Sequence, residues 1–479
     1  MTLRTRWAPV MRALLPSFVV GRIWADAKQQ YRLHPTSYLD GLRGLASFIV
    51  FICHYTEPNH GYFVPAYGRN GDNIPSSFLQ LPYVRIIYSG RPMVHIFFVI
   101  SGFVLSYKPL KSIHQGSQEK CFTVLASSTF RRPIRLFLPC IIDTFVIAVL
   151  MQFGALYKPV PSNWVAMRDW VVGVFYRVCW PWDWDHEMWP PFDGHLWTIP
   201  IEFNHSMLLF LAIMCMSRLR LLLRQAFVVA IMVYGIACGR WATLEFFGGM
   251  FLAEMHVLRS MQSEGYTSPK NSRWARAWPT LKTVLCVLAL LVGFYIGGWP
   301  NFNPDKTWGI AFLNSITPTP FLGGDMPQRL WFALGALLIV WACGELAIVR
   351  RMLEGPFAQY CGRVSYAIYI VHGPFLEICQ LPIIGLPHIA QKGQPGEEGY
   401  VPELIGFGIK GIFGHTTTTQ QFLSWFVALV IVFPFVVWAS DLFWRFVDLP
   451  IVRLGRTLEN MCLDTSSESK EREGYAVLG

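Results

Sequence analysis

Long apolar stretches separated by short polar segments dominate this chain. Runs of about 17–25 mostly apolar residues are long enough to cross a bilayer as helices. Ten such runs can be distinguished, and the pattern therefore predicts an all-α fold, a polytopic bundle of transmembrane helices. The predicted spans are residues 39–57, 91–107, 136–156, 197–216, 223–239, 241–258, 281–299, 328–348, 362–382 and 421–445.

The basic residues between these runs predict how the bundle is oriented. Lys and Arg accumulate in the cytoplasmic loops of membrane proteins, and here they concentrate in the N-terminal segment, in every second loop and in the tail. The intervening loops are poorer in basic residues, and the loop at 157–195 contains more acidic than basic ones. Both termini are therefore predicted to lie in the cytoplasm.

The same pattern predicts three regions. Residues 1–37 form a cytoplasmic or interfacial segment, in which an apolar run interrupted by Arg12 and Pro16 is typical of a helix lying on the membrane rather than of a signal peptide. Residues 38–454 form the transmembrane domain. Residues 455–479 form a polar tail that we expect to be disordered, because it has too few apolar residues to bury.

Composition agrees with a membrane protein. In this chain 53% of the residues are hydrophobic and only 15% are charged, whereas about a quarter of the residues of a typical soluble protein are charged. The net charge of +10 comes from short clusters between apolar runs rather than from one basic stripe, so no nucleic-acid partner is expected. The oligomeric state cannot be predicted.

An arginine and a histidine lie in the first predicted span. Arg43 and His54 are eleven residues apart, which brings them to within about 20° of one another around a helix, at a rise of about 16 Å. Ionisable groups in a span usually mark a site, and a histidine can take a proton from a hydroxyl at neutral pH. The structural alternative is an Asp40–Arg43 pair with a hydrogen-bonded histidine at the helix end.

The fourth predicted span is also unusually polar. Glu202 and His205 lie three residues apart on one helical face, which favours a site there because buried polar groups need water, substrate or one another. In the second span, Ser101 and Gly102 are two small residues among otherwise large side chains. Helix packing is favoured for this pair over a catalytic serine, because the GxSxG spacing is absent.

Two further polar features leave both readings open. The cluster of Arg131, Arg132 and Arg135 could bind phosphates or lipid headgroups, or could serve only as a topological signal. His372, in the ninth span, could be a packed histidine or part of a site. No metal is expected, because the segment 183–195 contains carboxylates and two histidines without HExxH spacing, in a proline-rich loop.

Taken together and in this order, these segments resemble acyltransferase family 3, integral-membrane enzymes that move acyl groups, often acetyl, onto hydroxyls. The resemblance runs from Tyr38 to about Leu454. With no appended hydrolase domain expected, the chain resembles the stand-alone fungal members of the family. The residues that carry it are Asp40, Gly41, Arg43, Gly44 and His54; Val94, Phe97, Phe98, Ser101, Gly102 and Phe103; Arg131, Arg132, Arg135, Leu136 and Pro139; Trp197 and Glu202; and Gly362, Ser365, Tyr366, Tyr369 and His372.

The resemblance implies an enzyme whose donor is acyl-CoA, with acetyl-CoA expected, and with no permanently bound cofactor. Direct transfer is preferred over an acyl-enzyme, since no activated Ser or Cys signature appears. The implied roles are general base for His54, positioning of the donor for Arg43, orientation of the base or acceptor for Glu202 and His372, and binding of the CoA phosphates for Arg131, Arg132 and Arg135.

The function predicted is therefore O-acylation of a small, fairly apolar hydroxylated molecule, such as a terpenoid or polyketide in natural-product biosynthesis. The endoplasmic reticulum is a candidate membrane. A glycan or a lipid is the alternative acceptor. From a different class, a proton-coupled transporter would use Arg43, His54 and Glu202 as a relay instead.

Overall fold

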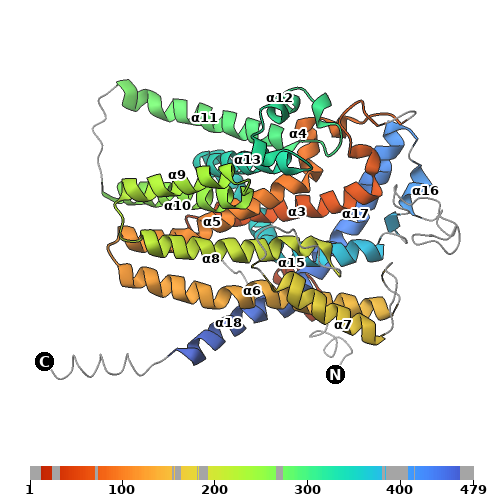
Figure 1. Cartoon of the computed structure of the whole chain (residues 1–479). Coiled ribbons are helices and arrows are strands. Elements are labelled where there is room, and N and C mark those ends of the chain that lie inside the picture. The colour runs from red at the N-terminus through yellow and green to blue at the C-terminus, as the bar shows by residue number, and fades with distance from the viewer. Residues whose placement is uncertain are drawn as a thin grey trace.

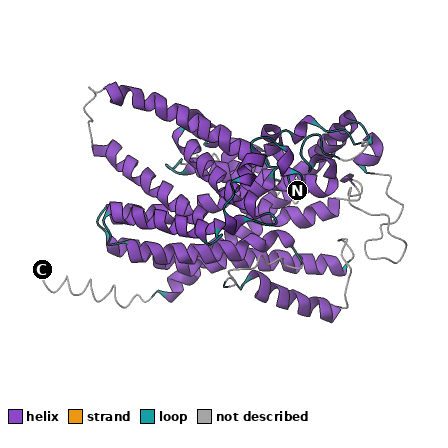
Figure 2. Ribbon diagram, turned by 45° about the horizontal axis from the view of Figure 1, so that its top comes forward, coloured by secondary structure: helices purple, strands orange, loops and turns teal. Residues whose placement is uncertain are grey.

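The fold of this chain is a bundle of helices, which Figures 1 and 2 show from two directions. It was obtained as a computed structural model. Within the described residues there is no strand beyond an isolated bridge between Pro65 and Phe302, so the predicted all-α class is confirmed. The described residues are 12–23, 33–70, 74–153, 156, 163–180, 182, 192–265, 273–379, 383–384, 408–414 and 416–463.

Each of the ten predicted spans coincides with a long helix. Apolar runs of this length become helices in a bilayer because every backbone N–H and C=O must then be paired within the segment. The ten helices are α3 (Ser37–Asn59), α5 (Gly90–His114), α6 (Gln118–Gln152), α8 (Thr198–Met216), α9 (Leu221–Ala237), α10 (Trp241–Gly265), α11 (Arg273–Gly297), α13 (Met326–Glu345), α15 (Pro356–Cys379) and α17 (Thr418–Phe443).

Shorter elements connect these helices or lie at their ends. The short α-helices are α2 (Ser17–Ile23), α4 (Pro82–Arg85), α7 (Asn163–Gly173), α12 (Ile310–Ser315), α14 (Ala347–Leu353), α16 (Ile409–Phe413) and α18 (Leu449–Cys462). The 3₁₀ turns are η1 (Gly61–Phe63), η2 (Phe78–Gln80), η3 (Ile86–Tyr88), η5 (Gly194–Trp197), η6 (Pro304–Lys306) and η7 (Thr319–Phe321), and π-helical turns are η4 (Val174–Val178) and η9 (Trp444–Asp448).

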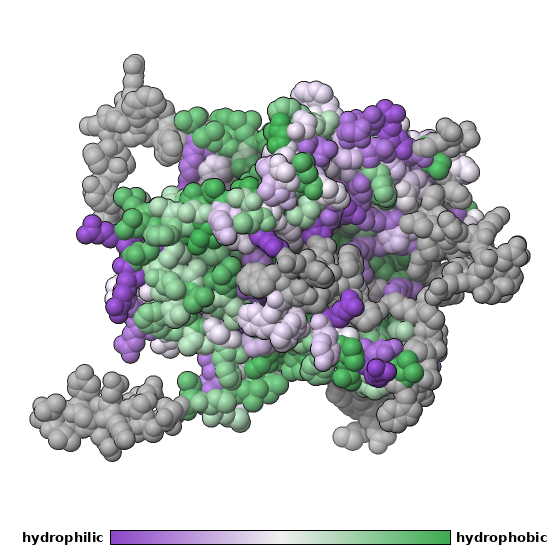
Figure 3. Space-filling model, viewed as in Figure 1, coloured by the Kyte–Doolittle hydropathy of each residue, from purple (hydrophilic) through white to green (hydrophobic). Residues whose placement is uncertain are grey.

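Six helical segments among the described residues are long and apolar enough to cross a membrane. They comprise α5, α6, η5 with α8, α11 from Pro279, α13, and α17 continued through α18. Figure 3 shows a broad hydrophobic area over much of the left and middle of one face, with hydrophilic residues gathered at the left edge and the upper right. This surface is as expected for a multi-pass membrane protein.

Helices α3 and α15 pack backbone against backbone at two glycines. A Cβ atom on Gly44 would overlap the backbone of Cys361 and Gly362, and one on Gly362 would overlap the carbonyl of Asp40. Small residues permit such close approach between helices in a membrane. The Gly residues of the first span thus set the distance between the two helices that carry Arg43 and His372.

Helices α5 and α10 approach one another in the same way. A Cβ on Gly102 would overlap the backbone of Phe246, and one on Gly249 would overlap the carbonyl of Val99. The packing role predicted for the small residues Ser101 and Gly102 is therefore confirmed for the glycine. The serine has a second role, described below.

The two ends of the described chain are anchored on the bundle. Ser17 of α2 hydrogen-bonds to Asp441 of α17 through both its N–H (3.0 Å) and its hydroxyl (2.6 Å). Helix α18 lies along α6, joined by an ion pair of 3.0 Å between Arg131 and Glu459. Since α18 ends at Cys462, the tail predicted from residue 455 begins inside a helix, and residues 464–479 lie outside the described residues.

Candidate active site

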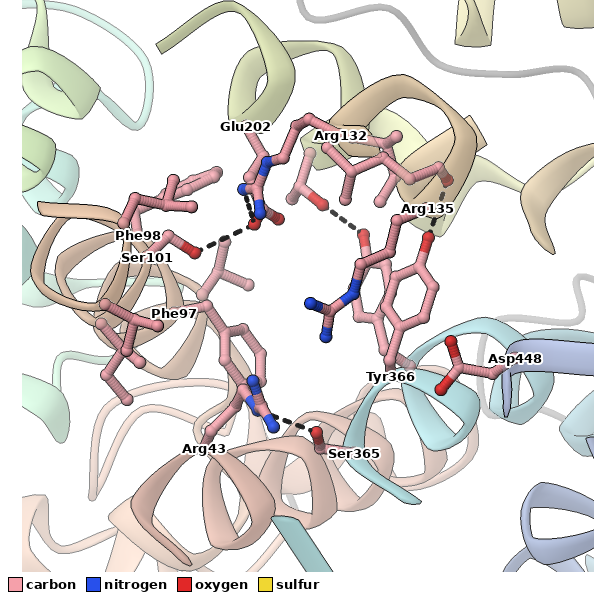
Figure 4. Close-up of a pocket in the computed structure, with 18 of the residues that line it drawn as sticks. Arg43, Phe97, Phe98, Ser101, Arg132, Arg135, Glu202, Ser365, Tyr366 and Asp448 are labelled. Atoms are coloured by element: carbon pink, nitrogen blue, oxygen red, sulfur yellow. Dashed lines mark hydrogen bonds and ion pairs between the residues drawn. The ribbon is translucent and has the colours of Figure 1, made fainter. Parts of the chain in front are cut away.

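A cavity of about 170 Å³ lies between helices α3, α5, α6, α8 and α15 (Figure 4). Apolar side chains of α5, together with Leu136 and Ile199, form much of its wall. Polar groups from these five helices and from the π-helical turn η9 also face it, and most of them are residues that the sequence pointed to. Those polar residues are Arg43, Ser101, Arg132, Arg135, Thr198, Glu202, Arg363, Ser365, Tyr366, Tyr369 and Asp448.

Arg43 is held at the boundary between α3 and α15. Its guanidinium donates to the hydroxyl of Ser365 and to the carbonyl of Gly362, each at 3.1 Å. It also forms an ion pair of 3.1 Å with Asp40, one turn earlier in α3. The sequence left open whether Arg43 forms a structural pair with Asp40 or belongs to a site. The structure contains the pair, and the paired Arg43 also lines the cavity.

Glu202 of α8 is neutralised by Arg132 of α6. An Arg132 Nη2 donates to Glu202 Oε1 at 2.7 Å, and the hydroxyl of Ser101 donates to the same oxygen at 2.9 Å. Glu202 therefore ties three helices together beside the cavity (Figure 4). Its expected neighbour His205 faces the other way, with a ring nitrogen 2.9 Å from the carbonyl of Ile201 and its ring against Phe246.

The three arginines of the predicted phosphate-binding cluster have different surroundings. Arg135 points into the centre of the cavity (Figure 4) and forms no hydrogen bond or ion pair within the described part of the chain. Arg131 instead pairs with Glu459 and does not line this cavity. Asp448, which lies on the π-helical turn η9, also lines the cavity.

One end of the cavity is closed by Thr198 and Tyr369. Their hydroxyls are 2.5 Å apart, and the Tyr369 hydroxyl also hydrogen-bonds to the backbone carbonyl of His195. His195 lies one helical turn before Thr198, and His372 lies one turn after Tyr369. The cavity therefore ends beside two histidines.

Three histidines from different helices meet at this end. His54 lies with its ring centre 4.1 Å from that of His195 and 5.1 Å from that of His372, and the rings of His195 and His372 are 4.7 Å apart. One ring nitrogen from each lies within 4.8 Å of the other two. We call His54, His195 and His372 the histidine cluster.

Hydrogen bonds orient two of these rings. His195 Nδ1 lies 2.7 Å from Asp193 Oδ1, an oxygen that also accepts from the His195 backbone N–H at 2.9 Å. His372 Nδ1 lies 2.9 Å from the carbonyl of Ile368. Because a carboxylate and a carbonyl can only accept, each Nδ1 carries the proton and each Nε2 carries a lone pair.

Asp193 is buried yet charged. Burial by itself raises the pKa of this carboxyl, but the His195 ring and backbone N–H outweigh burial, so the pKa of Asp193 lies below its ordinary value. The carboxylate consequently stays ionised at neutral pH and can stabilise a positive charge on His195.

Sequence reasoning found two members of the histidine cluster and missed the third. His54 and His372 were candidates because they stand out in apolar spans. His195 and Asp193 were set aside because the search was for HExxH spacing in the segment 183–195. The usable signal was their position, immediately before the polar helix that begins at Thr198 and contains Glu202.

The chain is similar to known acyltransferases over almost its whole length. The family profile described as an acyltransferase domain matches residues 36–445. The O-acetyltransferase PaAT-1 of Phomopsis amygdali is 30% identical, covering 93% of this chain and 89% of the relative. Acyltransferase R4 of a Phoma species is 27% identical over 78% of this chain and 89% of its own.

A third relative is also named an acyltransferase. Acyltransferase clz18 of Cochliobolus lunatus is 26% identical, covering 90% of this chain and 95% of the relative. No solved structure is significantly similar to the chain. The motif order predicted this outcome, and the chain belongs to acyltransferase family 3, a family of membrane O-acyltransferases.

Proposed function

We propose that this protein transfers an acetyl group from acetyl-CoA to a hydroxyl of a small, fairly apolar molecule in natural-product biosynthesis. The carrying observation is a cavity lined by arginines in which Tyr369, at one end, hydrogen-bonds to the backbone of His195, a member of the histidine cluster. Acetyl is chosen among acyl groups because the relative of 30% identity is named an O-acetyltransferase. The apolar wall of the cavity supports a terpenoid or polyketide acceptor over a polar one.

The arginines would bind the phosphates of the donor. Arg135 is the strongest candidate because its guanidinium faces the cavity and forms no ion pair within the described residues. Arg132 is already paired with Glu202, so it contributes a donor N–H rather than a net charge. Arg131 is left out of this role, since it pairs with Glu459 away from the cavity.

The separation of Arg43 from His54 fits a long donor. Both lie on the continuous helix α3, eleven residues and thus about 16 Å apart along its axis. Phosphates near the arginines would leave the extended pantetheine arm to run along the cavity, and the Thr198–Tyr369 pair would separate to let its thioester reach the histidine cluster. Arg43 would then hold the donor, not polarise His54 directly, because a charge at such a distance acts weakly.

The chemical step requires a base at the histidine cluster. His54 would accept the proton of the acceptor hydroxyl, whose oxygen attacks the thioester carbonyl carbon. The carbon–sulfur bond then breaks, and the CoA thiolate takes the proton from the His54 imidazolium as it leaves. Atoms and charge balance without an acyl-enzyme.

His195 and Asp193 would assist this base more directly than Glu202. The ionised Asp193 and the His195 ring are adjacent to His54, so they can stabilise the positive charge that His54 gains. Glu202 lies two helical turns further along α8, against Arg132. We therefore assign Glu202 to positioning Arg132 and Ser101.

We also propose ten membrane crossings with both termini in the cytoplasm. The basic residues of alternate loops support this orientation. Arg43 would then lie nearer the cytoplasm, which holds acyl-CoA, and the histidine cluster nearer the opposite face. The endoplasmic reticulum is the membrane that we propose for it.

The proposal is tested with purified protein in nanodiscs, labelled acetyl-CoA and a panel of terpenoid and polyketide alcohols. The expected result is a labelled ester, with release of free CoA thiol, that is lost in His54→Ala. The matched control is His256→Ala, a histidine that lines a separate cavity near Arg259, and it should retain activity.

Other outcomes would redirect the proposal. Ester formation only with glycans or lipids would overturn the acceptor class and keep the chemistry. Proton-coupled flux of the alcohol across proteoliposomes, without any ester, would overturn acyl transfer in favour of transport.

A further inference from the structure

The histidine cluster has the composition of a metal site. It brings together three imidazoles from α3, from the turn η5 before α8, and from α15. We propose that His54, His195 and His372 bind one divalent transition-metal ion, of which zinc is the best match.

The distances require only a small closure. Three donors that lie within 4.8 Å of one another are at most about 2.8 Å from the centre of an equilateral triangle, which is the side divided by √3. A zinc–nitrogen bond is about 2.0–2.1 Å long. Each imidazole would therefore have to move inward by less than about 1 Å. Rotation about the side-chain bonds supplies such a shift without moving a helix.

The protonation pattern leaves the correct atoms for ligation. In His195 and His372, the Nδ1 atoms are engaged by Asp193 and by the carbonyl of Ile368. Their Nε2 lone pairs are therefore available. A histidine that ligates a metal usually donates its other N–H to a carboxylate or a backbone carbonyl, and this cluster contains one of each arrangement.

Burial supplies the independent observation. The His372 side chain is completely buried, and its Nε2 has no hydrogen-bond partner within the described part of the chain. An unpaired polar atom in such a position is destabilising. His54 also forms no hydrogen bond in the described part of the chain, and one of its ring nitrogens lies within 4.8 Å of a ring nitrogen of His372.

Ligand chemistry selects the type of ion. Imidazole nitrogens suit zinc, copper, iron and nickel, whereas magnesium and calcium prefer oxygen. Three protein ligands with a fourth position left open is the arrangement of catalytic zinc sites. Asp193 would remain in contact with His195 instead of binding the ion, because its oxygens are not among the donor atoms that lie close together and its Oδ1 already accepts two hydrogen bonds.

A metal here would change how the acceptor is activated. The ion would stabilise an alkoxide formed from the acceptor hydroxyl, and the proton released would pass to the departing CoA thiolate. His54 would then act as a ligand instead of a free base. This consequence rests on the proposed acyl transfer, whereas metal binding itself does not.

The test measures metal before activity. Protein purified in detergent is stripped with a chelator, incubated with zinc alone, passed through a desalting column and analysed by mass spectrometry for metal content. We expect about one zinc per chain for the unaltered protein and for His256→Ala, and about a tenth of that or less for His54→Ala, His195→Ala and His372→Ala. Asp193→Asn should weaken zinc affinity by about 10- to 100-fold without abolishing binding.

Cobalt substitution gives a second readout that does not depend on turnover. Co²⁺ in the cluster should produce the visible absorption of a tetrahedral ion, and this absorption should vanish in His372→Ala but persist in His256→Ala. Equal zinc content in all variants, or none in the unaltered protein, overturns the metal site. Acetyl transfer that survives the chelator would leave the proposed function intact, whereas one bound zinc with no acetyl transfer to any acceptor would overturn only that function.

Discussion

The imidazole of His195 lies directly against the backbone of Gly373. A Cβ atom added to that glycine would come within 2.6 Å of His195 Nδ1 and 3.3 Å of Asp193 Oδ1. Gly373 follows His372 on α15, so the missing side chain opens the space in which the Asp193–His195 pair sits. The histidine cluster therefore depends on a residue that has no functional group.

Gly373→Ala should reduce acyl transfer by at least about tenfold with little loss of stability, because a misplaced reacting group by itself costs that much or more. The methyl group would displace His195 while the rest of α15 stays in place. The matched control is Gly335→Ala on α13, where a Cβ would make an ordinary contact of 3.4 Å with Ile296. Rates and thermal unfolding midpoints of the two variants decide the matter, and equal activity would contradict the role of Gly373.

Arg135→Ala should raise KM for acetyl-CoA about tenfold or more and leave kcat nearly unchanged. A hydrogen bond to a charged group contributes about 1.5–3 kcal/mol, and about 1.4 kcal/mol is a factor of ten. Arg131→Ala is the comparison, because Arg131 belongs to the same basic cluster but pairs with Glu459.

The donor phosphate can be tested directly with 3′-dephospho-acetyl-CoA. If Arg135 contacts the 3′-phosphate, the unaltered protein should prefer acetyl-CoA and the Arg135 variant should lose that preference. An equal rise in KM for the Arg131 and Arg135 variants would show that only the overall positive charge matters.

Glu202→Gln should keep measurable kcat while it weakens donor binding. The neutral amide can still accept from Arg132 and Ser101, but Arg132 loses its counter-charge. If Glu202 were the general base, the same change would abolish kcat as His54→Ala is expected to do. Steady-state kinetics of both variants, with acetyl-CoA and acceptor varied in turn, separate the two roles.

Gly44→Ala should destabilise the fold itself. The added methyl group would overlap the backbone of Cys361 and Gly362, and overpacking of this kind costs about 1–3 kcal/mol or more. We expect a lower unfolding temperature and less monodisperse protein on gel filtration, with Gly335→Ala again as the control. An unfolding temperature unchanged from the parent would mean that α3 and α15 can separate freely.

Hydropathy was sufficient to predict the helices, because a bilayer imposes helical hydrogen bonding on any long apolar run. It also exposed Arg43, His54 and His372, since an ionisable residue is conspicuous among apolar neighbours. His195 was not conspicuous, because it lies outside the apolar run, in a loop where polar residues are ordinary. Its partners are on α3 and α15, and no local pattern reports contacts between helices so distant in sequence.

The arginine cluster shows the same limit. Arg131, Arg132 and Arg135 are equivalent as a charge pattern, yet the structure gives them three different surroundings. Arg131 pairs with Glu459 outside the cavity, Arg132 lines the cavity paired with Glu202, and Arg135 lines it without an ion pair in the described residues. Which of them could meet a donor depends on how α6 is rotated against α8 and α18.

The attachment of α2 to α17 also reaches the helix that bears His372. Asp441 Oδ2 accepts hydrogen bonds from the hydroxyl of Ser17 and, at 2.9 Å, from the hydroxyl of Tyr360 at the start of α15. One carboxylate thus holds the N-terminal helix α2 against both α15 and α17. A binding partner that drew residues 12–23 away would break the hydrogen bonds between Ser17 and Asp441 and loosen the packing of α15. Such a partner would slow acyl transfer without contacting the cavity.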